Sequence, residues 1–157
     1  MKTVYIETSI PSYLTARASA DVKSTTWQLV TKQWWLEESK KYELFISELV
    51  IAEASRGNIE ASKRRLSSLD GLAELSIEPI TGELANNIIA EGGMPKSSEA
   101  DAIHVALCAV HHIDYLLTWN CRHINNAITK PVIRDICKKY GFSCPEICTP
   151  LELLYEV

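Results

Sequence analysis

The sequence has few cysteines, and they form no recognisable pairing pattern. There are five in 157 residues, an odd number that includes no Cys-x-x-Cys pair. Disulfide frameworks use cysteines in even sets, and structural zinc sites usually place two of them close together in sequence. We therefore expect reduced, structural thiols. A zinc site built from Cys121, His123 and more distant residues stays open as an alternative, although its spacing matches no common zinc pattern.

Long apolar runs are also missing. The N-terminal segment reaches a carboxylate at Glu7 after only three apolar residues, which is too soon for the core of a signal peptide. No later run approaches the roughly 20 apolar residues that a membrane-spanning helix needs. The sequence thus predicts a cytoplasmic protein without a membrane partner.

Basic residues are also fewer than acidic residues. The chain has 16 lysines and arginines against 20 aspartates and glutamates, which gives a formal net charge of −4. Nucleic-acid-binding proteins usually carry a basic surface, so the overall charge does not by itself indicate such a ligand.

Short apolar segments bounded by turn or capping residues predict the strands. They are Val4–Ile6, Leu44–Ile46, Leu72–Ile80, Tyr115–Leu117 and Glu146–Cys148. The first, second and fourth are continuous apolar runs without alternation, which is typical of parallel strands that helices cover on both faces.

Helical patterns occupy the intervals between these strands, and several end at a glycine. The predicted helices are Ser19–Lys41 (as one helix or as two with a bend), Ser47–Arg56, Ile59–Leu69, Thr81–Glu91, Ser98–His112 and Pro131–Tyr140. The element order β-α-α-β-α-α-β-α-α-β-α-β predicts a three-layer α/β/α sandwich with a central parallel sheet of about five strands. With 46% hydrophobic residues and no obvious linker, a single domain over residues 1–157 is expected.

Four polar residues fall where a ligand site is expected in such a sheet. Glu7 ends the first predicted strand, and Glu53 lies in the helix after the second. Asp101 begins the helix before the fourth strand, and Asn120 follows that strand. Because ligands of open α/β sheets bind beyond the carboxyl ends of the strands, these side chains are candidates for one common site.

Ordinary structural roles compete with this interpretation. Glu7, followed by Thr8 and Ser9, fits a solvated strand end or a helix cap. Asp101 lies three residues after Ser98, the spacing of a capping box in which the acid bonds back to the amide of the cap residue.

Glu53 is harder to explain without a site. At 100° per residue it shares a helix stripe with Leu49 and Val50, so an ionisable group is placed on a face that should be buried. Asp101 likewise shares a stripe with Val105. Burying such carboxylates together is unfavourable unless a cation is present, and a divalent cation resolves the conflict.

Oxygen ligands from a few acids, completed by water, suit Mg²⁺ or Mn²⁺ better than zinc. Such a metal lowers the pKa of a bound water, holds a phosphate and stabilises a leaving oxygen. It would also supply positive charge to an acidic chain. Lys40-Lys41, Lys63-Arg64-Arg65 and Lys138-Lys139 are either phosphate contacts or solvated helix faces.

Taken together, these segments resemble the PIN-domain family and, within it, the VapC-like toxins of bacterial and archaeal toxin–antitoxin pairs. The resemblance covers essentially the whole chain. It rests on the order and spacing of five segments, Val4–Ser9, Ser47–Glu53, Glu99–Leu107, Leu116–Asn120 and Pro145–Pro150.

The resemblance implies a role for each residue that matches the family pattern. Glu7, Glu53 and Asp101 correspond to the catalytic, metal-binding acids, Asn120 to a fourth metal ligand, and Thr8, Ser9 and Thr118 to residues near the substrate or a bound water. It further implies an endoribonuclease that hydrolyses RNA with Mg²⁺ or Mn²⁺, a homodimer, and a cognate antitoxin that inserts into the acidic groove.

Two departures from the family pattern matter. The first acid is usually aspartate, and Glu7 reaches one methylene further. The fourth acidic position is Asn120, which offers a carbonyl oxygen but no charge, and this disfavours a second metal site.

Two other functions compete with the ribonuclease. One is a PIN fold with weakened catalysis that binds RNA or a protein, which Asn120 favours. The other is a metal-dependent phosphatase or related hydrolase, which is disfavoured because no Gly-rich phosphate loop, nucleophile elbow or Asp-x-Asp motif is present.

Overall fold

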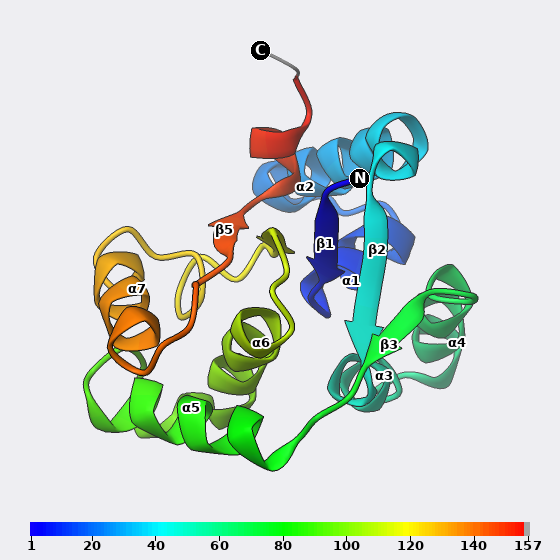
Figure 1. Ribbon diagram of the computed structural model, residues 1–157. Coiled ribbons are helices and arrows are strands. Elements are labelled where there is room, and N and C mark those ends of the chain that lie inside the picture. Colours follow the sequence, from blue (N-terminus) through cyan, green and yellow to red (C-terminus); the bar gives the residue numbers. More distant parts are fainter. Residues whose placement is uncertain (156–157) are drawn as a thin grey trace.

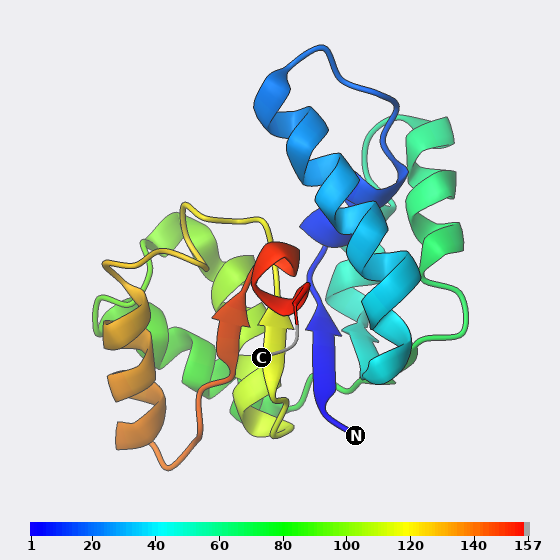
Figure 2. The same ribbon diagram turned by 90° about the horizontal axis from the view of Figure 1, so that it is seen from above.

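The computed structural model describes residues 1–155 as a parallel β-sheet with helices on both faces (Figures 1 and 2). The strands are β1 (Thr3–Ile6), β2 (Glu43–Ser47), β3 (Ala73–Leu75), β4 (Tyr115–Leu117) and β5 (Glu146–Cys148). Their order across the sheet is β3-β2-β1-β4-β5, and all neighbours are parallel. The predicted α/β/α sandwich with five strands is therefore confirmed over these residues.

The helices form two groups. They are α1 (Ser9–Thr15), α2 (Val22–Gln33), α3 (Glu48–Ala54), α4 (Ile59–Ser68), α5 (Pro79–Ala90), α6 (Glu99–Val110) and α7 (Lys130–Lys139), with short 3₁₀ turns at Ser39–Lys41, Lys96–Ser98 and Pro150–Leu153. The first four cover one face of the sheet and the last three cover the other, as the two views together show. This division is what right-handed crossovers produce when the chain reverses its direction across the sheet.

The central strand β1 is the most deeply buried part of the sheet. Val4, Tyr5 and Ile6 are all fully buried, because helices cover both faces and strands flank both edges. Such a strand has no solvent-facing side, which explains its continuous apolar sequence. The hydroxyl of Tyr5 is consequently placed inside the core, where it needs a partner.

One predicted strand is much shorter than expected. The segment 72–80 forms a strand only over Ala73–Leu75, and α5 begins at Pro79. The fixed φ of proline suits the first turn of a helix, and the Oγ1 of Thr81 accepts a hydrogen bond from the Glu78 N–H at 3.4 Å. Ile80, which the sequence suggested as a strand residue, therefore lies in a helix.

The long helix predicted over Ser19–Lys41 is divided. Its regular part begins at Val22, because Asp21 Oδ2 accepts the Ser24 N–H at 2.9 Å and caps it. After Gln33 the chain continues as one π-helical turn over Trp34–Glu38 and then as a 3₁₀ turn. The bend anticipated for this region is thus a change of helix type.

The topology fixes where a ligand site belongs. From β1 the chain moves outward to β2 and β3, and it returns to the other side of β1 as β4 and β5. The boundary between β1 and β4 is the switch point of the sheet, and crevices at the carboxyl ends of strands form there. No helix within residues 1–155 is long and apolar enough to cross a membrane.

Candidate active site

Glu7 lies at the switch point, directly after β1. Ile6 pairs with Leu117 across the sheet, and the Glu7 N–H donates to the Leu117 carbonyl at 3.2 Å. This register brings the residues that follow β1 beside those that follow β4. The side chain of Glu7 is only 6% exposed, so the structure rejects a freely solvated strand end.

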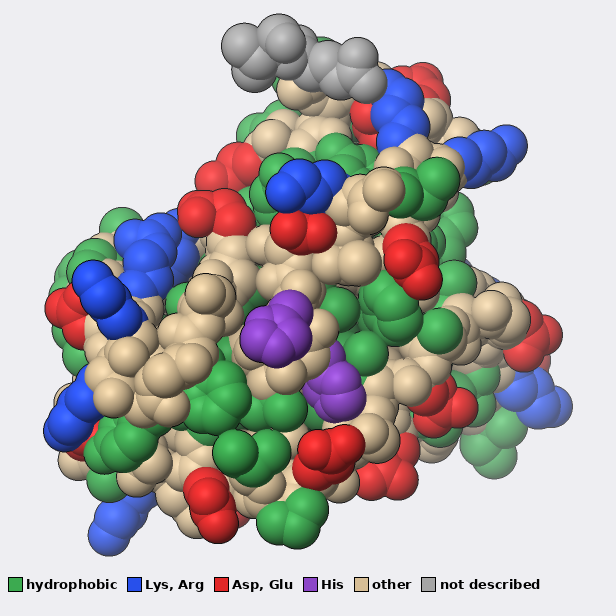
Figure 3. All heavy atoms as spheres, viewed as in Figure 1, with side chains coloured by type: hydrophobic (Ala, Val, Ile, Leu, Met, Phe, Trp, Pro, Cys, Tyr) green, Lys and Arg blue, Asp and Glu red, His purple; other side chains and the backbone are tan. Residues whose placement is uncertain are grey.

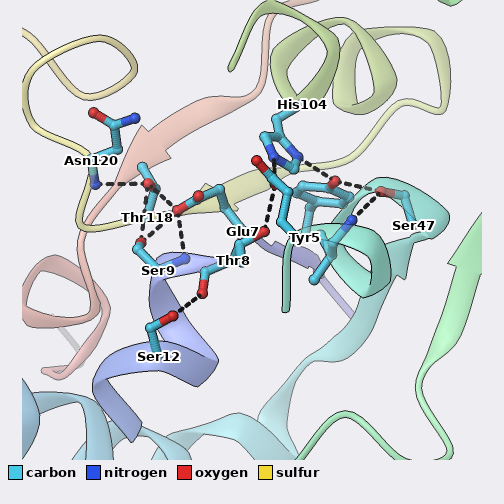
Figure 4. A network of polar contacts seen from close by, with 11 residues as sticks. Tyr5, Glu7, Thr8, Ser9, Ser12, Ser47, His104, Thr118 and Asn120 are labelled. Carbon is cyan, nitrogen blue, oxygen red and sulfur yellow. Dashed lines mark hydrogen bonds and ion pairs between the residues drawn. The ribbon is translucent and has the colours of Figure 1, made fainter. Parts of the chain in front are cut away.

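Three donors converge on one oxygen of this carboxylate (Figure 4). Oε1 of Glu7 accepts hydrogen bonds from Thr118 Oγ1 at 2.6 Å, from Ser9 Oγ at 2.5 Å and from the Ser9 N–H at 3.1 Å. The second oxygen, Oε2, has no hydrogen bond to the described residues and is not fully enclosed. Glu7 is therefore held rigidly by one oxygen while the other is free to bind a ligand.

The same hydroxyls also hold the loop after β4. Ser9 Oγ accepts the Trp119 N–H at 2.8 Å, and Thr118 Oγ1 accepts the Asn120 N–H at 2.9 Å. Thr118 is fully buried, so it acts through Glu7 and this loop. Contact of Ser9 and Thr118 with a substrate or water stays a prediction.

Glu53 projects from α3 into the same region. Its Oε1 accepts a hydrogen bond from Thr8 Oγ1 at 2.7 Å and lies 2.6 Å from His104 Nε2. Thr8 thus donates its hydroxyl to Glu53 and makes no side-chain cap of α1. The capping alternative holds only for Glu7, whose Oε1 accepts the N–H of Ser9 at the start of α1. The side chain of Glu53 is 20% exposed, and its Oε2 has no hydrogen bond within residues 1–155.

His104 connects Glu53 to a buried chain of hydrogen bonds. Its Nδ1 lies 2.6 Å from the Tyr5 hydroxyl, which lies 2.8 Å from Ser47 Oγ (Figure 4). A carboxylate only accepts, so Nε2 carries a hydrogen toward Glu53, and in the neutral ring Nδ1 then accepts from Tyr5. Tyr5 in turn accepts from Ser47, whose oxygen accepts the Val50 N–H at 3.4 Å. Both ring nitrogens of His104 and the hydroxyls of Tyr5 and Ser47 therefore all have hydrogen-bond partners.

The surroundings act on these groups in opposite directions. Burial works to raise the pKa of Glu53, but the hydrogen bonds from His104 and Thr8 outweigh it and lower that pKa below its ordinary value. Burial raises the pKa of Tyr5 well above its ordinary range, so this residue stays a neutral hydroxyl. Glu53 is consequently kept ionised and fixed in place.

Asp101 lies in the first turn of α6, where the charges of both glutamates reach it. Burial raises the pKa of Asp101, and the charges of Glu7 and Glu53 add to this effect, while His104 and His123 oppose it. No hydrogen bond to its carboxylate is formed within residues 1–155. Ser98 makes no side-chain cap of α6, so the capping-box alternative for Asp101 is wrong.

Asn120 is placed differently from the three acids. Its Oδ1 accepts the His123 N–H at 3.0 Å and so closes the turn after β4. In Figure 4 the hydroxyl of Thr118 lies between Asn120 and Glu7. The amide thus supports the loop, and its role as a metal ligand stays a prediction.

The donor set fits a hard cation in kind. Glu7 and Glu53 each present an oxygen without a hydrogen bond, and Asp101 presents a carboxylate with no partner. Among the described residues, however, no three His, Cys, Asp or Glu side chains surround a common point closely enough to hold a metal ion. Magnesium keeps several water ligands and is commonly bound through one or two carboxylates, so this arrangement is compatible with a cation bound partly through water.

Sequence reasoning missed four members of the site. His104 and His123 act on the acids directly, while Tyr5 and Ser47 continue the hydrogen-bonded series from His104. None of the four carries a recognisable signal alone. The available clue was spacing, since His104 follows Asp101 by three residues and so lies on nearly the same helix face. Partnership with Tyr5 depends on the sheet register and is invisible in the sequence.

Comparisons with known proteins were made for both sequence and fold. No family model matches the sequence, and neither does any curated protein. The fold matches a chain of VapBC2 from Rickettsia felis, solved bound to a DNA fragment from its promoter, with a TM-score of 0.57 and 14% identity over 94% of this chain and 98% of that one. It also matches Mycobacterium tuberculosis VapC20, a toxin described as cleaving the sarcin–ricin loop, with a TM-score of 0.58 and 14% identity over 90% of this chain and 99% of that one.

Both matches span nearly the full length of each chain, whereas the low identity carries no information about activity. The protein described here therefore has the α/β fold of the PIN-domain VapC toxins.

Proposed function

We propose that this protein is a metal-dependent endoribonuclease and the toxin of a toxin–antitoxin pair. One observation carries the proposal, namely that Glu7 after β1, Glu53 on α3 and Asp101 on α6 lie near enough for the charges of the two glutamates to raise the pKa of Asp101. Each carboxylate keeps at least one oxygen without a hydrogen bond. Structural ion pairs do not explain such a group, because no lysine or arginine bonds to any of the three within residues 1–155.

Mg²⁺ or Mn²⁺ would be held by Glu7, Glu53 and Asp101, and when bound it would activate water and neutralise the charge on the reacting phosphate. The protein itself contributes by orienting the carboxylates of Glu7 and Glu53. Thr118 and Ser9 fix Glu7 through Oε1, and Thr8 and His104 fix Glu53 in the same way. Both glutamates thus direct their free oxygens outward at no further cost in side-chain entropy.

The electrostatics support the same conclusion. Three carboxylates gathered in a half-buried site repel one another, which is unfavourable for the folded protein alone. The raised pKa of Asp101 is the visible consequence of burial and of this repulsion. Clusters of this kind are common at functional sites, where a bound cation relieves the repulsion.

The partners are part of the proposal. The similarity to VapBC2, which was solved bound to promoter DNA, supports a partner antitoxin for this chain, and VapC20 supports RNA as the substrate. A homodimer and a cytoplasmic location complete the proposal.

The experiment is cleavage of end-labelled structured and single-stranded RNAs with Mg²⁺, Mn²⁺ or EDTA. The wild-type protein should cut with metal and stop in EDTA, and an Asp101→Asn variant should lose at least a hundredfold in rate, a typical loss for removal of one electrostatic group from an active site. An exposed aspartate on α7 supplies the control, Asp135→Asn, which should cut normally.

A second function has its own support. Asn120 replaces the fourth acid expected from the family resemblance, and its amide is engaged with the His123 N–H. This favours a PIN fold that binds RNA or a protein with weakened catalysis. Tight RNA binding by a folded, metal-supplied protein that cuts none of the RNAs would establish this function instead.

A further inference from the structure

A hollow lined by arginines lies between the C-terminal end of α1 and the N-terminal half of α4. Its volume is about 350 Å³, and the polar side chains around it include Ser12, Thr15, Arg17, Asn58, Arg64 and Arg65. We call it the arginine pocket. Pockets of roughly 300–1,000 Å³ are large enough for small ligands or for part of a larger one.

Two of its arginines are fixed by backbone carbonyls. The Nε of Arg64 donates to the Thr15 carbonyl at 3.0 Å. The Nε of Arg65 donates to the Ala54 carbonyl at 3.0 Å, and one of its terminal nitrogens donates to the Arg56 carbonyl. Each guanidinium keeps terminal N–H groups without a partner in the described residues. An arginine already anchored in this way loses little entropy when it binds an anion.

Arg17 also lines the pocket, and its side chain supports no other part of the described structure. Its side chain is exposed, and its guanidinium makes no hydrogen bond or ion pair within residues 1–155. The one acid in the lining, Glu60, lies 3.9 Å from Lys63 and is mostly exposed. The pocket is therefore a locally basic place in an acidic protein.

The pocket is connected to the candidate active site by direct contacts. Ser12, in its wall, donates to the Thr8 carbonyl at 3.0 Å, and Thr8 bonds to Glu53 (Figure 4). On the other side, Arg65 holds the carbonyl of Ala54, the residue next to Glu53. Figure 2 shows α1 and α4 side by side at this end of the molecule. Only two hydrogen bonds, both made by Thr8, thus separate the wall of the pocket from Glu53.

We propose that the arginine pocket binds a backbone phosphate of the RNA strand next to the phosphate that is cut. This inference rests on the proposed ribonuclease function, and it explains how a chain with a net charge of −4 retains a polyanion. Guanidinium groups bind phosphate through paired N–H donors, and such contacts position a strand without reading its sequence. The pocket is the anion-binding counterpart of the acidic site.

The test measures RNA binding apart from cleavage. Asp101→Asn serves as the background, so that a fluorescein-labelled single-stranded RNA stays intact, and fluorescence anisotropy gives the affinity at several salt concentrations with Mg²⁺ present. Adding Arg17→Ala should weaken binding several-fold for unrelated sequences alike. It should also reduce the slope of log K against log salt by about 0.7, the value for one phosphate contact on a single strand.

Arg134→Ala is the matched control, because Arg134 is a half-exposed arginine on α7 that lies 3.6 Å from Glu146. It should leave both the affinity and the slope unchanged. Arg64→Lys tests geometry, since it keeps the charge but loses the paired donors. It should bind RNA more weakly than the background, while its denaturation curve shows that α1 and α4 remain packed.

The outcomes separate this inference from the proposed function. If the wild-type protein cuts RNA while Arg17→Ala and Arg64→Lys bind it as the background does, the pocket is not a phosphate site and the nuclease stands. If the wild-type protein cuts no RNA but Arg17→Ala still lowers the affinity and the salt slope, the nuclease fails and the phosphate site stands.

Discussion

The Nε2 of His104 lies 2.6 Å from Oε1 of Glu53, and its Nδ1 lies 2.6 Å from the Tyr5 hydroxyl. The histidine is fully buried and has both ring nitrogens engaged. It therefore connects an acid of the candidate site to the central strand of the sheet. Such a residue stabilises the fold and orients the acid at the same time.

Replacing His104 with alanine tests the first of these roles. The change leaves a cavity and deprives both Tyr5 and Glu53 of a partner, so the free energy of unfolding should fall by about 2–4 kcal/mol. Urea denaturation followed by circular dichroism measures it. The control is His111→Ala, because His111 is less buried and makes only one hydrogen bond, to the Ser76 carbonyl at 2.8 Å. A loss no larger than that of the control would show that the buried chain is not important for stability.

Unlike His104, Asp101 should lower the stability of the folded protein while it is needed for cleavage. Its pKa is raised by burial and by the neighbouring glutamates, so at pH 7 the ionised side chain destabilises the metal-free folded protein. Asp101→Asn should therefore increase the free energy of unfolding at pH 7 by on the order of 1 kcal/mol while cleavage is lost. The gain should shrink as the pH falls through the raised pKa, because the wild-type carboxyl then becomes neutral.

Chemical denaturation in EDTA at pH 7 and pH 4 measures this effect. Asp135→Asn is the matched control, since Asp135 is exposed and forms no ion pair within residues 1–155. A lower stability of Asp101→Asn at pH 7 would mean that Asp101 has a structural partner in solution. Repulsion from Glu7 and Glu53 would then not dominate the contribution of Asp101 to stability.

The sequence predicted the strands that are apolar throughout and failed where a short segment carries two signals. Tyr115–Leu117 was predicted with its observed bounds, because it is flanked by turn residues and both faces are buried. The segment 72–80 also looked apolar, but Pro79 directs the chain into a helix and leaves only three residues in β3. In this segment the backbone preference of proline determined the structure, and the apolar pattern did not.

The acids of the site were found for a similar reason. The sequence alone singles out Glu53, because an ionisable group on an apolar helix stripe conflicts with the burial expected there. His104 on an apolar helix gives no such signal, because buried histidines are common. The bonds from Thr8 to Glu53 and from Thr118 to Glu7 join residues 45 and 111 positions apart. Pairings at that distance depend on the order of strands in the sheet, which periodicity does not specify.

The contacts of Asp114 predict how the N-terminal ends of β1 and β4 respond to acid. Its Oδ2 accepts the Thr3 N–H at 2.9 Å and its Oδ1 accepts from Lys2 at 3.2 Å, which ties the start of β1 to the start of β4. The backbone hydrogen bond from Thr3, with help from Lys2, lowers the pKa of Asp114. A lowered pKa contributes stability above the unfolded-state value of about 3.9, and that contribution is lost as the pH falls through the folded-state pKa.

Asp114→Ala should therefore destabilise the protein at pH 7 by no more than about 1 kcal/mol, since the side chain is 35% exposed and solvent screens its charge. The difference from the wild type should narrow below about pH 4. Thermal denaturation of both proteins between pH 3 and pH 7 measures it, with Asp135→Ala as the control. A difference that stays constant over this range would assign the effect to lost packing and not to the ionised carboxylate.

Asn120 offers the sharpest test of the metal proposal. Aspartate at this position keeps an oxygen that accepts the His123 N–H, so the turn should survive, while one negative charge is added beside the loop that holds Glu7. If a cation is bound here, Asn120→Asp should bind Mn²⁺ several-fold more tightly in a calorimetric titration and cut RNA faster. Asn126→Asp is a close control, because Asn126 Oδ1 likewise accepts a backbone N–H, that of Ile128 at 2.9 Å, in the same connection between β4 and α7. Equal Mn²⁺ affinity in the two variants would place the cation away from Asn120, and the three remaining acids would then have to hold it without help from the loop after β4.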